Sequence, residues 1–526
     1  MRLKNSKAGL YFNTLKYMKC SQVYYRIRKM AGLECGIGVA AHADIESVNI
    51  INPVREVDFD PVFLSRFQVS ELMSDHISFL HSEAVMDWNG EWIFRDKSAL
   101  WNYNLHYFEY LFPLLNEYRK EKEPSYLKKA VFMIRSWISK NPCQKGGPGW
   151  APYTINLRLT NWLSFYSLTE SDLTEECRMI MRKSIAEQYI FLSRHVEKDI
   201  LGNHYLEDLK TLILCAVYFK DWRMLDTAYG ALLKECNEEI LEDGMHYELS
   251  PMYHNIILED LIKIYVALKG TDYPADELKK YIQIMLDAAW SLGESVNRLP
   301  LFNDCGNNVA KSLLSLVEAA ENHLFIKPIY KSVFPKAGFY IFKRGEWKLI
   351  VDAGQPGPTY IPGHAHCDAL SFELYRNGEP IITNCGTYAY QTDLRSQFRN
   401  TASHNTVMIN GVEQSQCWGA FRMAKRSSVH VLDADENYLR AEIIDYCGQK
   451  CLRTIHFSKE LTVSDQSESN TVTGFIHFLE KVPVKYCCEQ KKTIKHLYAP
   501  DYGQYSEINA LAYSGKGRIE ISVKLD

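Results

Sequence analysis

The sequence lacks long apolar runs, a cysteine framework and an excess of charge of either sign. Its longest apolar stretch, residues 211–219, is well short of the roughly 18 apolar residues that a membrane-spanning helix needs. The 14 cysteines show no CxxC pair and no regular spacing, which is typical of reduced thiols in a cytosolic protein. With 60 basic and 64 acidic residues, the net charge of −4 does not predict nucleic-acid binding.

Acidic residues are absent from the first 33 positions, where basic residues are frequent. This segment shows no apolar core of a secretory signal, so we expect a cytoplasmic protein, with the inner membrane surface as an alternative location. A solvated basic helix or arm is one interpretation of the segment, and peripheral contact with a membrane or a polyanion is the other. Its basic residues are Arg2, Lys4, Lys7, Lys16, Lys19, Arg26, Arg28 and Lys29.

Residues 101–330 are predicted to form successive helices. A length of 526 residues with 46% hydrophobic content predicts a soluble protein of two or three domains. Within this range apolar residues recur at helical spacing, which predicts antiparallel helices of roughly 12–18 residues. Periodicity does not distinguish a bundle, a solenoid and a closed toroid. The expected helices lie at 107–115, 126–138, 155–166, 179–192, 205–219, 224–240, 253–268 and 278–292.

Residues 331–526 change to short segments rich in β-branched and aromatic residues. Asn377-Gly378 and Asn410-Gly411 are strong signals for hairpin turns between such segments. This pattern predicts an antiparallel β-sandwich. Residues 1–100 show neither a helical nor a strand pattern throughout, and we interpret them as the basic segment and a mixed region that leads into the helical domain.

Histidine is scarce, with 16 in the chain, yet two occur in one short segment of the β half. In an extended chain His364, His366 and Asp368 would share one face, because residues two apart point the same way. Together with His404 they could hold a metal or a substrate anion, since neutral imidazole suits zinc. The alternative is that they extend the buried face of the following strand.

Polar groups also mark two expected helix starts in the helical half. Asn203-His204 precedes one apolar helix, and Ser250 with Pro251 has the pattern of an N-cap that places Tyr253 in the first turn. These groups could line one rim with proton-transfer side chains. The alternative is an ordinary cap with packed polar residues.

Aromatic and arginine residues form further patches that suit sugar stacking and carboxylate recognition. We expect Tyr103, Trp150, Arg158 and Arg399 to bind substrate on this basis. The alternatives are helix-core aromatics for the first three and solvated surface for Arg399.

Taken in order, these segments resemble the heparinase II/III-like polysaccharide lyases, a group that includes related alginate lyases. The match runs from about residue 100 to 415. The resemblance implies an α+β multidomain protein, with an N-terminal incomplete (α/α) toroid followed by a C-terminal antiparallel β-sandwich and an active site between them. The segments are Asn203-His204, Ser250–His254, Gly363–Asp368 continuing to Ser371-Phe372, Gly386–Tyr388, and Arg399 with Ser403–Val407.

The resemblance implies β-elimination across the 4-linkage of a uronic-acid-containing glycan. Because no secretory signal is visible, we expect either an imported oligosaccharide as the substrate or a role inside the cell in capsule or exopolysaccharide metabolism. Removing the C5 proton beside a carboxylate concentrates negative charge, so the carboxylate must be neutralised. Asn203 with His204 or His364 matches that role. Tyr253 matches the family tyrosine that removes or delivers a proton, and His204 is the alternative base. A tyrosine, with a pKa of about 10, acts as a base only near positive charge.

The resemblance also implies a structural zinc in several family members, at positions that match His366, Asn384 and His404. The family has an aspartate where this chain has Asn384, and a neutral amide is a poor zinc ligand. Asp368 or a hydrogen-bonded network could take its place. The expected partner is an acidic polysaccharide or oligosaccharide. A uronosyl C5-epimerase and a non-catalytic glycan-binding or assembly protein are the alternative functions.

Overall fold

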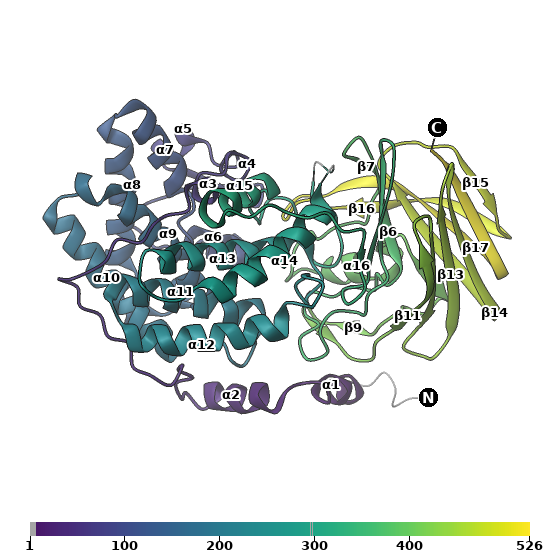
Figure 1. Cartoon of the computed structure of the whole chain (residues 1–526), viewed down its shortest axis with the longest axis horizontal. Coiled ribbons are helices and arrows are strands. Elements are labelled where there is room, and N and C mark those ends of the chain that lie inside the picture. Colours follow the sequence, from purple (N-terminus) through teal and green to yellow (C-terminus); the bar gives the residue numbers. More distant parts are fainter. Residues whose placement is uncertain (1–6, 295, 297, 526) are drawn as a thin grey trace.

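A helical domain and a β domain lie end to end in the computed structural model, which describes residues 7–294, 296 and 298–525 (Figure 1). The last helix of the helical domain, α15, ends at Leu324, and the first strand of the large sheet, β3, begins at Val333; a short helix, α16 (Arg395–Arg399), lies within the β domain. This is the toroid followed by a β-sandwich that the sequence predicts. Within the described residues, no helix combines the length and the apolar composition needed to cross a membrane.

The helices of the toroid follow the predicted apolar periodicity, and each expected helix overlaps one in the structure. The helix expected at 107–115 begins only at Leu111, because Phe108 adopts a left-handed φ of 65° that a helix does not accommodate. Helix α15 was not predicted. The bounds are α6 (Ala99–Leu105), α7 (Leu111–Glu121), α8 (Pro124–Lys140), α9 (Pro152–Thr169), α10 (Glu175–Arg194), α11 (Asn203–Phe219), α12 (Trp222–Glu239), α13 (Pro251–Lys269), α14 (Asp276–Gly293) and α15 (Leu313–Leu324).

Helices α11 and α13 form the centre of the toroid and are buried along almost their whole length. Burying charged residues is tolerable only when they are paired. Lys210 of α11 therefore contacts Glu207 of its own helix and Asp260 of α13, the latter at 2.7 Å. The Lys210–Asp260 pair links the middle of α11 to the middle of α13.

The β domain is built on one antiparallel sheet of thirteen strands within the described residues. Strand β14 pairs with β13 before an irregularity between Gln466 and Thr471, and with β8 and β7 after it. One long strand therefore belongs to both halves of the sandwich. The strands are β3 (Val333–Phe334), β4 (Phe339–Arg344), β5 (Trp347–Asp352), β6 (Ser371–Arg376), β7 (Glu379–Ile382), β8 (Val407–Ile409), β11 (Ser428–Asp435), β12 (Tyr438–Ile444), β13 (Lys450–Phe457), β14 (Glu460–Phe478), β15 (Val484–Cys487), β16 (Gln490–Tyr498) and β17 (Ser506–Lys524).

Both Asn-Gly pairs form turns, as predicted. Asn377 and Gly378 have φ values of 49° and 84° between β6 and β7, and Asn410 and Gly411 have 48° and 69° after β8. Two consecutive positive φ angles match the twist of a two-residue hairpin. The small hairpin of β9 (Cys417–Trp418) and β10 (Arg422–Met423) lies outside the large sheet.

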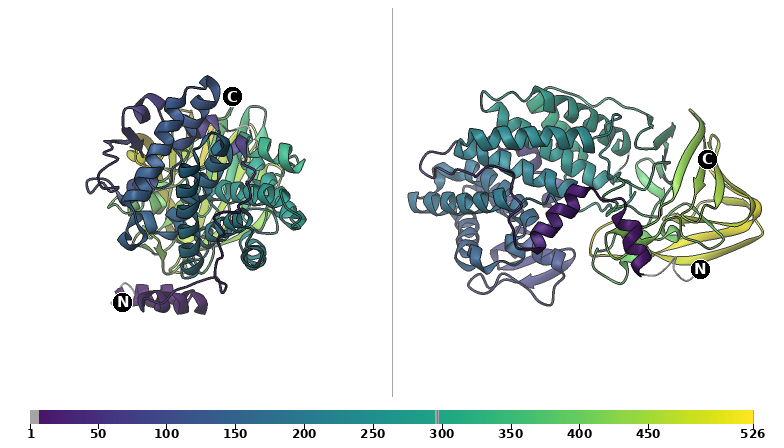
Figure 2. Two further views of the ribbon diagram at one scale, coloured as in Figure 1. Left: turned by 90° about the vertical axis from the view of Figure 1, so that its left-hand side faces the viewer. Right: turned by 90° about the horizontal axis from the view of Figure 1, so that it is seen from below.

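The first part of the chain crosses both domains. We name residues 7–33 the N-terminal strap, which lies along the lower side of the molecule in Figure 1 and over the domain junction in Figure 2. Helix α1 contacts the β domain, where Trp418 Nε1 donates a hydrogen bond to Thr14 Oγ1 at 3.0 Å. Helix α2 contacts the toroid, where Gln22 Nε2 donates to the Ile200 carbonyl at 3.0 Å. The basic residues Arg2 and Lys4 lie outside the described residues.

The remaining N-terminal elements cover the outside of the toroid. Residues 35–54 run along it without regular structure, and Asn49 bonds the end of α11 through its backbone N–H and its amide. The bounds of the N-terminal elements are α1 (Lys7–Leu15), α2 (Cys20–Met30), α3 (Arg55–Asp58), α4 (Pro61–Leu64), α5 (Val69–Met73), β1 (His76–Phe79) and β2 (Ser82–Val85).

Candidate active site

Three residues that the sequence singled out meet between the two domains. Asn203 is the first residue of α11, Tyr253 lies in the first turn of α13, and His364 lies on the loop between β5 and β6. Asn203 Nδ2 is 3.4 Å from His364 Nε2, and the rings of Tyr253 and His364 have centroids 4.1 Å apart. Sequence reasoning identified all three residues, and the fold places them in one site.

The backbone before α11 brings a carboxylate close to this site. Gly202 has a φ of 62°, and a Cβ atom at this position would lie 2.6 Å from Glu248 Oε1. Only glycine fits here, because any side chain would be both strained and displaced. The Asn203 amide then donates from Nδ2 to Glu248 Oε2 at 3.0 Å and to Oε1 at 3.2 Å. Glu248 therefore fixes the orientation of the Asn203 carboxamide.

The carboxamide oxygen of Asn203 is buried and has no hydrogen-bond partner within the described residues. Buried polar atoms are nearly always paired, and an unpaired one costs free energy. A ligand that brings a hydrogen-bond donor to this position would remove that cost. The atom thus marks a place where a bound molecule is expected.

Asp304 is the centre of the buried polar network behind His364. Its carboxylate accepts from His364 Nδ1 at 2.9 Å, from His366 Nε2 at 2.8 Å and from Arg395 Nη2 at 2.7 Å. Burial alone would raise the pKa of Asp304, but the Arg395 guanidinium and the two histidine bonds hold that pKa well below its ordinary value. Asp304 thereby keeps the proton of His364 on Nδ1, and the other ring nitrogen, Nε2, is directed toward Asn203.

Tyr253 belongs to a chain of hydrogen-bonded tyrosines. Its hydroxyl lies 2.8 Å from that of Tyr390, which lies 2.6 Å from that of Tyr502. Burial, then Tyr390 and the nearby carboxylates of Asp304 and Glu248, raise the pKa of Tyr253 well above its ordinary value. The hydroxyl therefore carries its proton at neutral pH, which suits an acid better than a base.

His204 follows Asn203 but is held by a different partner. Its Nδ1 lies 2.9 Å from Glu197 Oε2, and its ring lies against Tyr153 with centroids 4.7 Å apart. The side chain is 32% exposed. Burial opposes its positive charge, but the Glu197 carboxylate outweighs that effect and raises the pKa of His204. The Glu197 bond fixes Nδ1 as the donor and leaves Nε2 for a ligand.

Two of the expected substrate-binding residues lie in the core of the toroid instead. Arg158 is fully buried, and its guanidinium donates to Gln188 Oε1 at 2.7 Å, the Gly149 carbonyl at 2.7 Å and the His106 carbonyl at 3.3 Å. Trp150 is buried and donates from Nε1 to the Asn141 carbonyl at 3.0 Å. Neither side chain is available to a polysaccharide, so both predictions are corrected to structural roles.

Arg399 is likewise buried and holds the histidine loop. It donates from Nη2 to the Ala365 carbonyl at 2.8 Å and from Nη1 to the Ala420 carbonyl at 3.2 Å. Its predicted contact with substrate is corrected to positioning of the segment that carries His364. Tyr103, in α6, remains partly exposed, and its role in substrate binding stays a prediction.

A group that could hold a metal ion lies behind His364. It consists of His366, Asp368 and His404, whose ligand atoms lie within 4.8 Å of one another. His366 Nδ1 and His404 Nε2 are 3.3 Å apart, close to the about 3.3 Å that two zinc–nitrogen bonds at a tetrahedral angle would give. Burial lowers the pKa of His366 to about 4 and that of His404 well below its usual range, so both rings are neutral, as ligands must be.

The side-chain amide of Asn384 forms hydrogen bonds with a backbone N–H and with a serine beside this group. Its Oδ1 accepts from the Asn405 N–H at 3.1 Å, and its Nδ2 donates to Ser371 Oγ at 3.4 Å. Asp368, which the sequence suggested as the alternative to Asn384, supplies the carboxylate beside the two histidines. The group of His366, Asp368 and His404 can hold a cation without Asn384 as a ligand. The 3.3 Å distance between His366 Nδ1 and His404 Nε2 also suits a hydrogen bond between the two rings.

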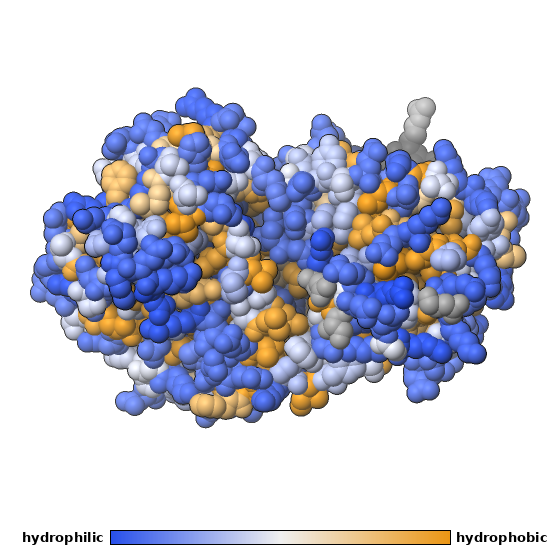
Figure 3. All heavy atoms as spheres, turned by 90° about the horizontal axis from the view of Figure 1, so that it is seen from above, coloured by the Kyte–Doolittle hydropathy of each residue, from blue (hydrophilic) through white to orange (hydrophobic). Residues whose placement is uncertain are grey.

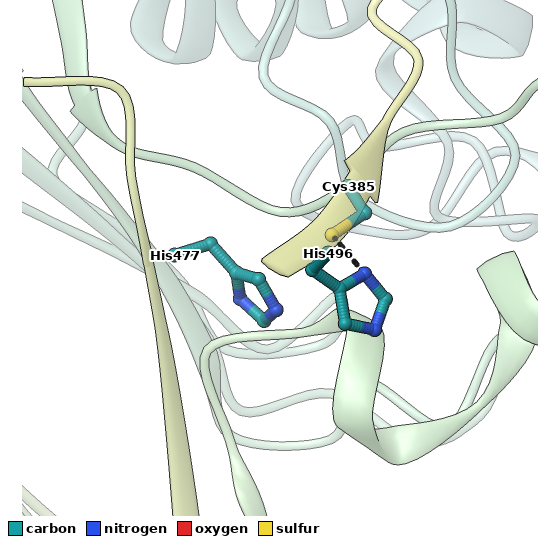
Figure 4. Close-up of side chains that lie close together, drawn as sticks. All are labelled: Cys385, His477 and His496. Carbon is teal, nitrogen blue, oxygen red and sulfur yellow. Dashed lines mark hydrogen bonds between the residues drawn. The ribbon is translucent and has the colours of Figure 1, made fainter. Parts of the chain in front are cut away.

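A second group combines Cys385, His477 and His496 (Figure 4). Cys385 Sγ lies 3.4 Å from His496 Nδ1. Both nitrogens of His477 already face protein oxygens, with Nδ1 3.1 Å from Asn405 Oδ1 and Nε2 3.0 Å from the Ala402 carbonyl. The neutral His477 ring can donate from only one of these nitrogens, and through it the ring links strand β14 to residues 402–405.

Several residues of the site were not predicted. Asp304 lies in a loop outside any periodic stretch, and Tyr390 and Tyr502 are far from each other and from Tyr253 in sequence. Phe421, which is 40% exposed, lies 6.2 Å from His364 by ring centroids and could stack on a sugar. None of these residues had a local sequence signal, because the contacts that bring them together join segments distant in sequence.

Comparison with known protein families gives matches along most of the chain. Residues 17–326 match the family model described as heparinase II/III N-terminus, and residues 327–475 match the one described as heparinase II/III-like, C-terminal. Among solved structures, heparinase III covers 98% of this chain and 89% of its own, with a TM-score of 0.70 and 17% identity. A mutant heparan sulfate lyase from Pedobacter heparinus has a TM-score of 0.60 at 17% identity, over 96% of this chain and 88% of its own.

Two curated relatives are named heparin-sulfate lyases. The one from Pedobacter heparinus is 24% identical over 61% of this chain, and the one from Bacteroides thetaiotaomicron is 23% identical over 65%. The matches span 53% and 57% of the length of these relatives. The two family models together cover both domains described above, and the chain belongs to the heparinase II/III-like family.

Proposed function

We propose that this protein is a polysaccharide lyase that cleaves a uronic-acid-containing glycan by β-elimination. The observation that carries the proposal is the meeting of Asn203, Tyr253 and His364 between the domains. An amide, a protonated hydroxyl and an imidazole are the groups that elimination beside a carboxylate requires. The names of the curated relatives favour a glycosaminoglycan as the substrate class.

His364 has the position to neutralise the uronate carboxylate, and the unpaired Asn203 Oδ1 can accept a hydrogen bond from a sugar hydroxyl. His364 Nε2 lies 3.4 Å from Asn203 Nδ2, whose hydrogens are directed to Glu248. When His364 Nε2 carries a proton, Asp304 compensates the positive charge from the other side of the ring at 2.9 Å. A hydrogen-bonded, charge-compensated carboxylate lowers the cost of removing the neighbouring C5 proton.

His204 has the geometry of the base and Tyr253 that of the acid. Glu197 orients His204 through Nδ1, so Nε2 can take the C5 proton, in the manner of a base held by a carboxylate. Tyr253 holds its proton because its surroundings raise its pKa, and it can deliver that proton to the leaving O4. Tyr390 can then donate to the Tyr253 oxygen and stabilise the charge left on it.

The Tyr253→Phe variant tests these roles. We expect its kcat on uronate glycans to fall by roughly 10²–10⁴-fold, the usual contribution of a general acid or base. Product formation is followed by the ultraviolet absorbance of the unsaturated sugar. Tyr340→Phe is the matched control, because Tyr340 is also buried but lies in the core of the β domain.

Three other outcomes distinguish the alternatives. Solvent hydrogen entering the sugar without cleavage would identify an epimerase. Binding of the glycan that is unchanged in Tyr253→Phe, with no turnover by the unmodified protein, would identify a binding protein. Equal turnover by the Tyr253→Phe variant and the unmodified protein would contradict the assignment of the acid.

The group of His366, Asp368 and His404 supports the further proposal of a structural zinc. Bound zinc would tie the histidine loop to the segment that carries His404 and so fix His364. We expect about one zinc ion per purified chain, and its loss together with a lower melting temperature in His404→Gln. His496→Gln is the matched control. A metal-free protein with the same melting temperature before and after zinc addition would contradict this proposal.

A further inference from the structure

The outer face of the N-terminal strap is apolar at helical spacing. Four exposed residues of α1 and five of α2 recur every three or four positions, so each set forms one stripe along its helix. Phe12 is 70% exposed, Ile27 is 62% exposed and Met30 is 83% exposed. The stripe of α1 consists of Ala8, Tyr11, Phe12 and Leu15, and that of α2 of Cys20, Val23, Tyr24, Ile27 and Met30.

The inner face of the strap packs against the two domains. Thr14 accepts the bond from Trp418, and Gln22, which is buried, bonds the Ile200 carbonyl. Apart from Tyr11, which also packs on Trp418, the apolar stripes are therefore the surface that remains after the strap has packed on both domains. Contiguous exposed apolar surface of this kind marks an interaction site.

Every charged side chain of the strap is positive. Residues 7–33 contain six lysines and arginines and no aspartate or glutamate. Lys19, Arg26 and Lys29 pair with Glu238 or Asp199 of the toroid. The other three, Lys7, Lys16 and Arg28, have no carboxylate partner within the described part of the chain and border the apolar stripes.

We propose that the strap docks this protein on the surface of an anionic phospholipid membrane. Exposed Phe, Leu, Ile and Met beside Lys and Arg on a helix are the composition of a helix that lies in the lipid interface. The apolar stripes would enter the headgroup region, and the unpaired cations would contact lipid phosphates. A second copy of the chain fits less well, because it would place Lys7, Lys16 and Arg28, which have no carboxylate partner within the described residues, against the same three cations.

The position of the strap agrees with this use. Both helices lie on one side of the molecule and project from it, so a flat surface can touch both at once (Figures 1 and 2). The opposite side is dominated by hydrophilic residues, with apolar ones in separate groups (Figure 3). Since α1 is fixed to the β domain and α2 to the toroid, docking would orient both domains relative to the bilayer.

The experiment is co-sedimentation of the full chain with lipid vesicles. We expect binding to phosphatidylcholine vesicles that contain phosphatidylglycerol, weak binding to pure phosphatidylcholine, and weaker binding at high salt because surface charges are screened. The variant Phe12→Ser/Ile27→Ser/Met30→Ser should bind at least about tenfold less. The matched control is Leu314→Ser/Ile329→Ser, which removes two equally exposed apolar side chains from elsewhere on the molecule.

Binding that is equal for the unmodified chain and the strap variant would overturn the proposal. So would a concentration-dependent dimer in size-exclusion chromatography that the strap variant abolishes while vesicles do not bind, since the occupant would then be a second copy. Turnover of a soluble oligosaccharide should be the same in the strap variant. A failure of membrane docking is thus separable from a failure of the lyase assignment.

Discussion

At the scale of single residues, the site is organised by buried carboxylates. Asp304 holds His364, Glu197 holds His204, and Glu248 holds Asn203. Each carboxylate accepts a hydrogen bond on one side of its partner and so directs the other side toward a ligand. The same principle orients histidines that act as bases or bind metals. The candidate catalytic groups are therefore ready in position before a substrate arrives.

The pair of Glu197 and His204 predicts a dependence on pH. The pKa of His204 is raised in the folded protein, so the stabilisation by the charged pair is present below the unfolded pKa and is lost as pH rises through the folded pKa. Glu197→Gln should reduce the free energy of unfolding by about 1 kcal/mol near pH 6 and have a smaller effect near pH 9. Urea unfolding at the two pH values measures this difference.

The same variant tests the role of His204 as a base. A base must be neutral, so kcat/KM should rise as pH passes the raised pKa of His204, and this rise should move to lower pH in Glu197→Gln. Glu176→Gln, which removes an exposed carboxylate on α10, is the control. An unchanged pH profile in Glu197→Gln would show that His204 is not the group whose proton limits the reaction.

At the scale of elements, the starts of two helices carry the candidate catalytic groups of the toroid. Helix α11 begins with Asn203, and α13 places Tyr253 in its first turn. The N-termini of helices carry partial positive charge and suit an anionic ligand such as a uronate. Ser250, predicted as the cap of α13, accepts from the Tyr253 N–H at 3.3 Å and donates to the Asp304 carbonyl at 2.6 Å.

Removing this cap should affect stability and catalysis together. We expect Ser250→Ala to lower the free energy of unfolding by about 1–2 kcal/mol, because both hydrogen bonds are lost. Tyr253 would lose its fixed position, so kcat should fall while KM changes little. Ser312→Ala, at the N-cap of α15, is the control for the loss of a cap away from the site. Loss of stability with unchanged kcat would show that the cap does not position Tyr253.

The sequence predicted the elements better where their pattern is local. Apolar spacing identified most helices of the toroid, but α6 and α15 were not predicted. Strand β16 is mostly polar and exposed, so it gave no alternating signal. Local patterns singled out Asn203, Tyr253 and His364, and the family resemblance implied their roles. Asp304 and Tyr390 were not, because their roles arise from contacts across the domain junction that no local pattern records. Arg158 was misassigned since burial of an arginine depends on partners distant in sequence.

At the scale of the whole molecule, the site is complete only when both domains are in place. The toroid contributes Asn203, His204 and Tyr253, and the β domain contributes His364 and Tyr390. Small changes in the angle between the domains would separate these groups. The strap contacts both domains and is one of the elements that hold this angle.

Weakening the contact between α1 and the β domain should release the first helix. Trp418 bonds Thr14 and lies against Tyr11 with ring centroids 4.8 Å apart. In Trp418→Ala we expect limited proteolysis within residues 7–19 to become about fivefold faster, the effect of losing about 1 kcal/mol of local stability. Trp222→Ala, which removes a half-exposed tryptophan from α12, is the control. An unchanged cleavage rate would show that α1 is held by other contacts.

The short link between α1 and α2 limits how far the two domains can separate. From Leu15 to Cys20 the chain has five Cα-to-Cα steps, which span at most about 17 Å when fully extended. The two domains can therefore separate only on the side of the molecule away from this link. Under the proposed function, a long glycan chain would enter from that side, and its ends would leave by the same route.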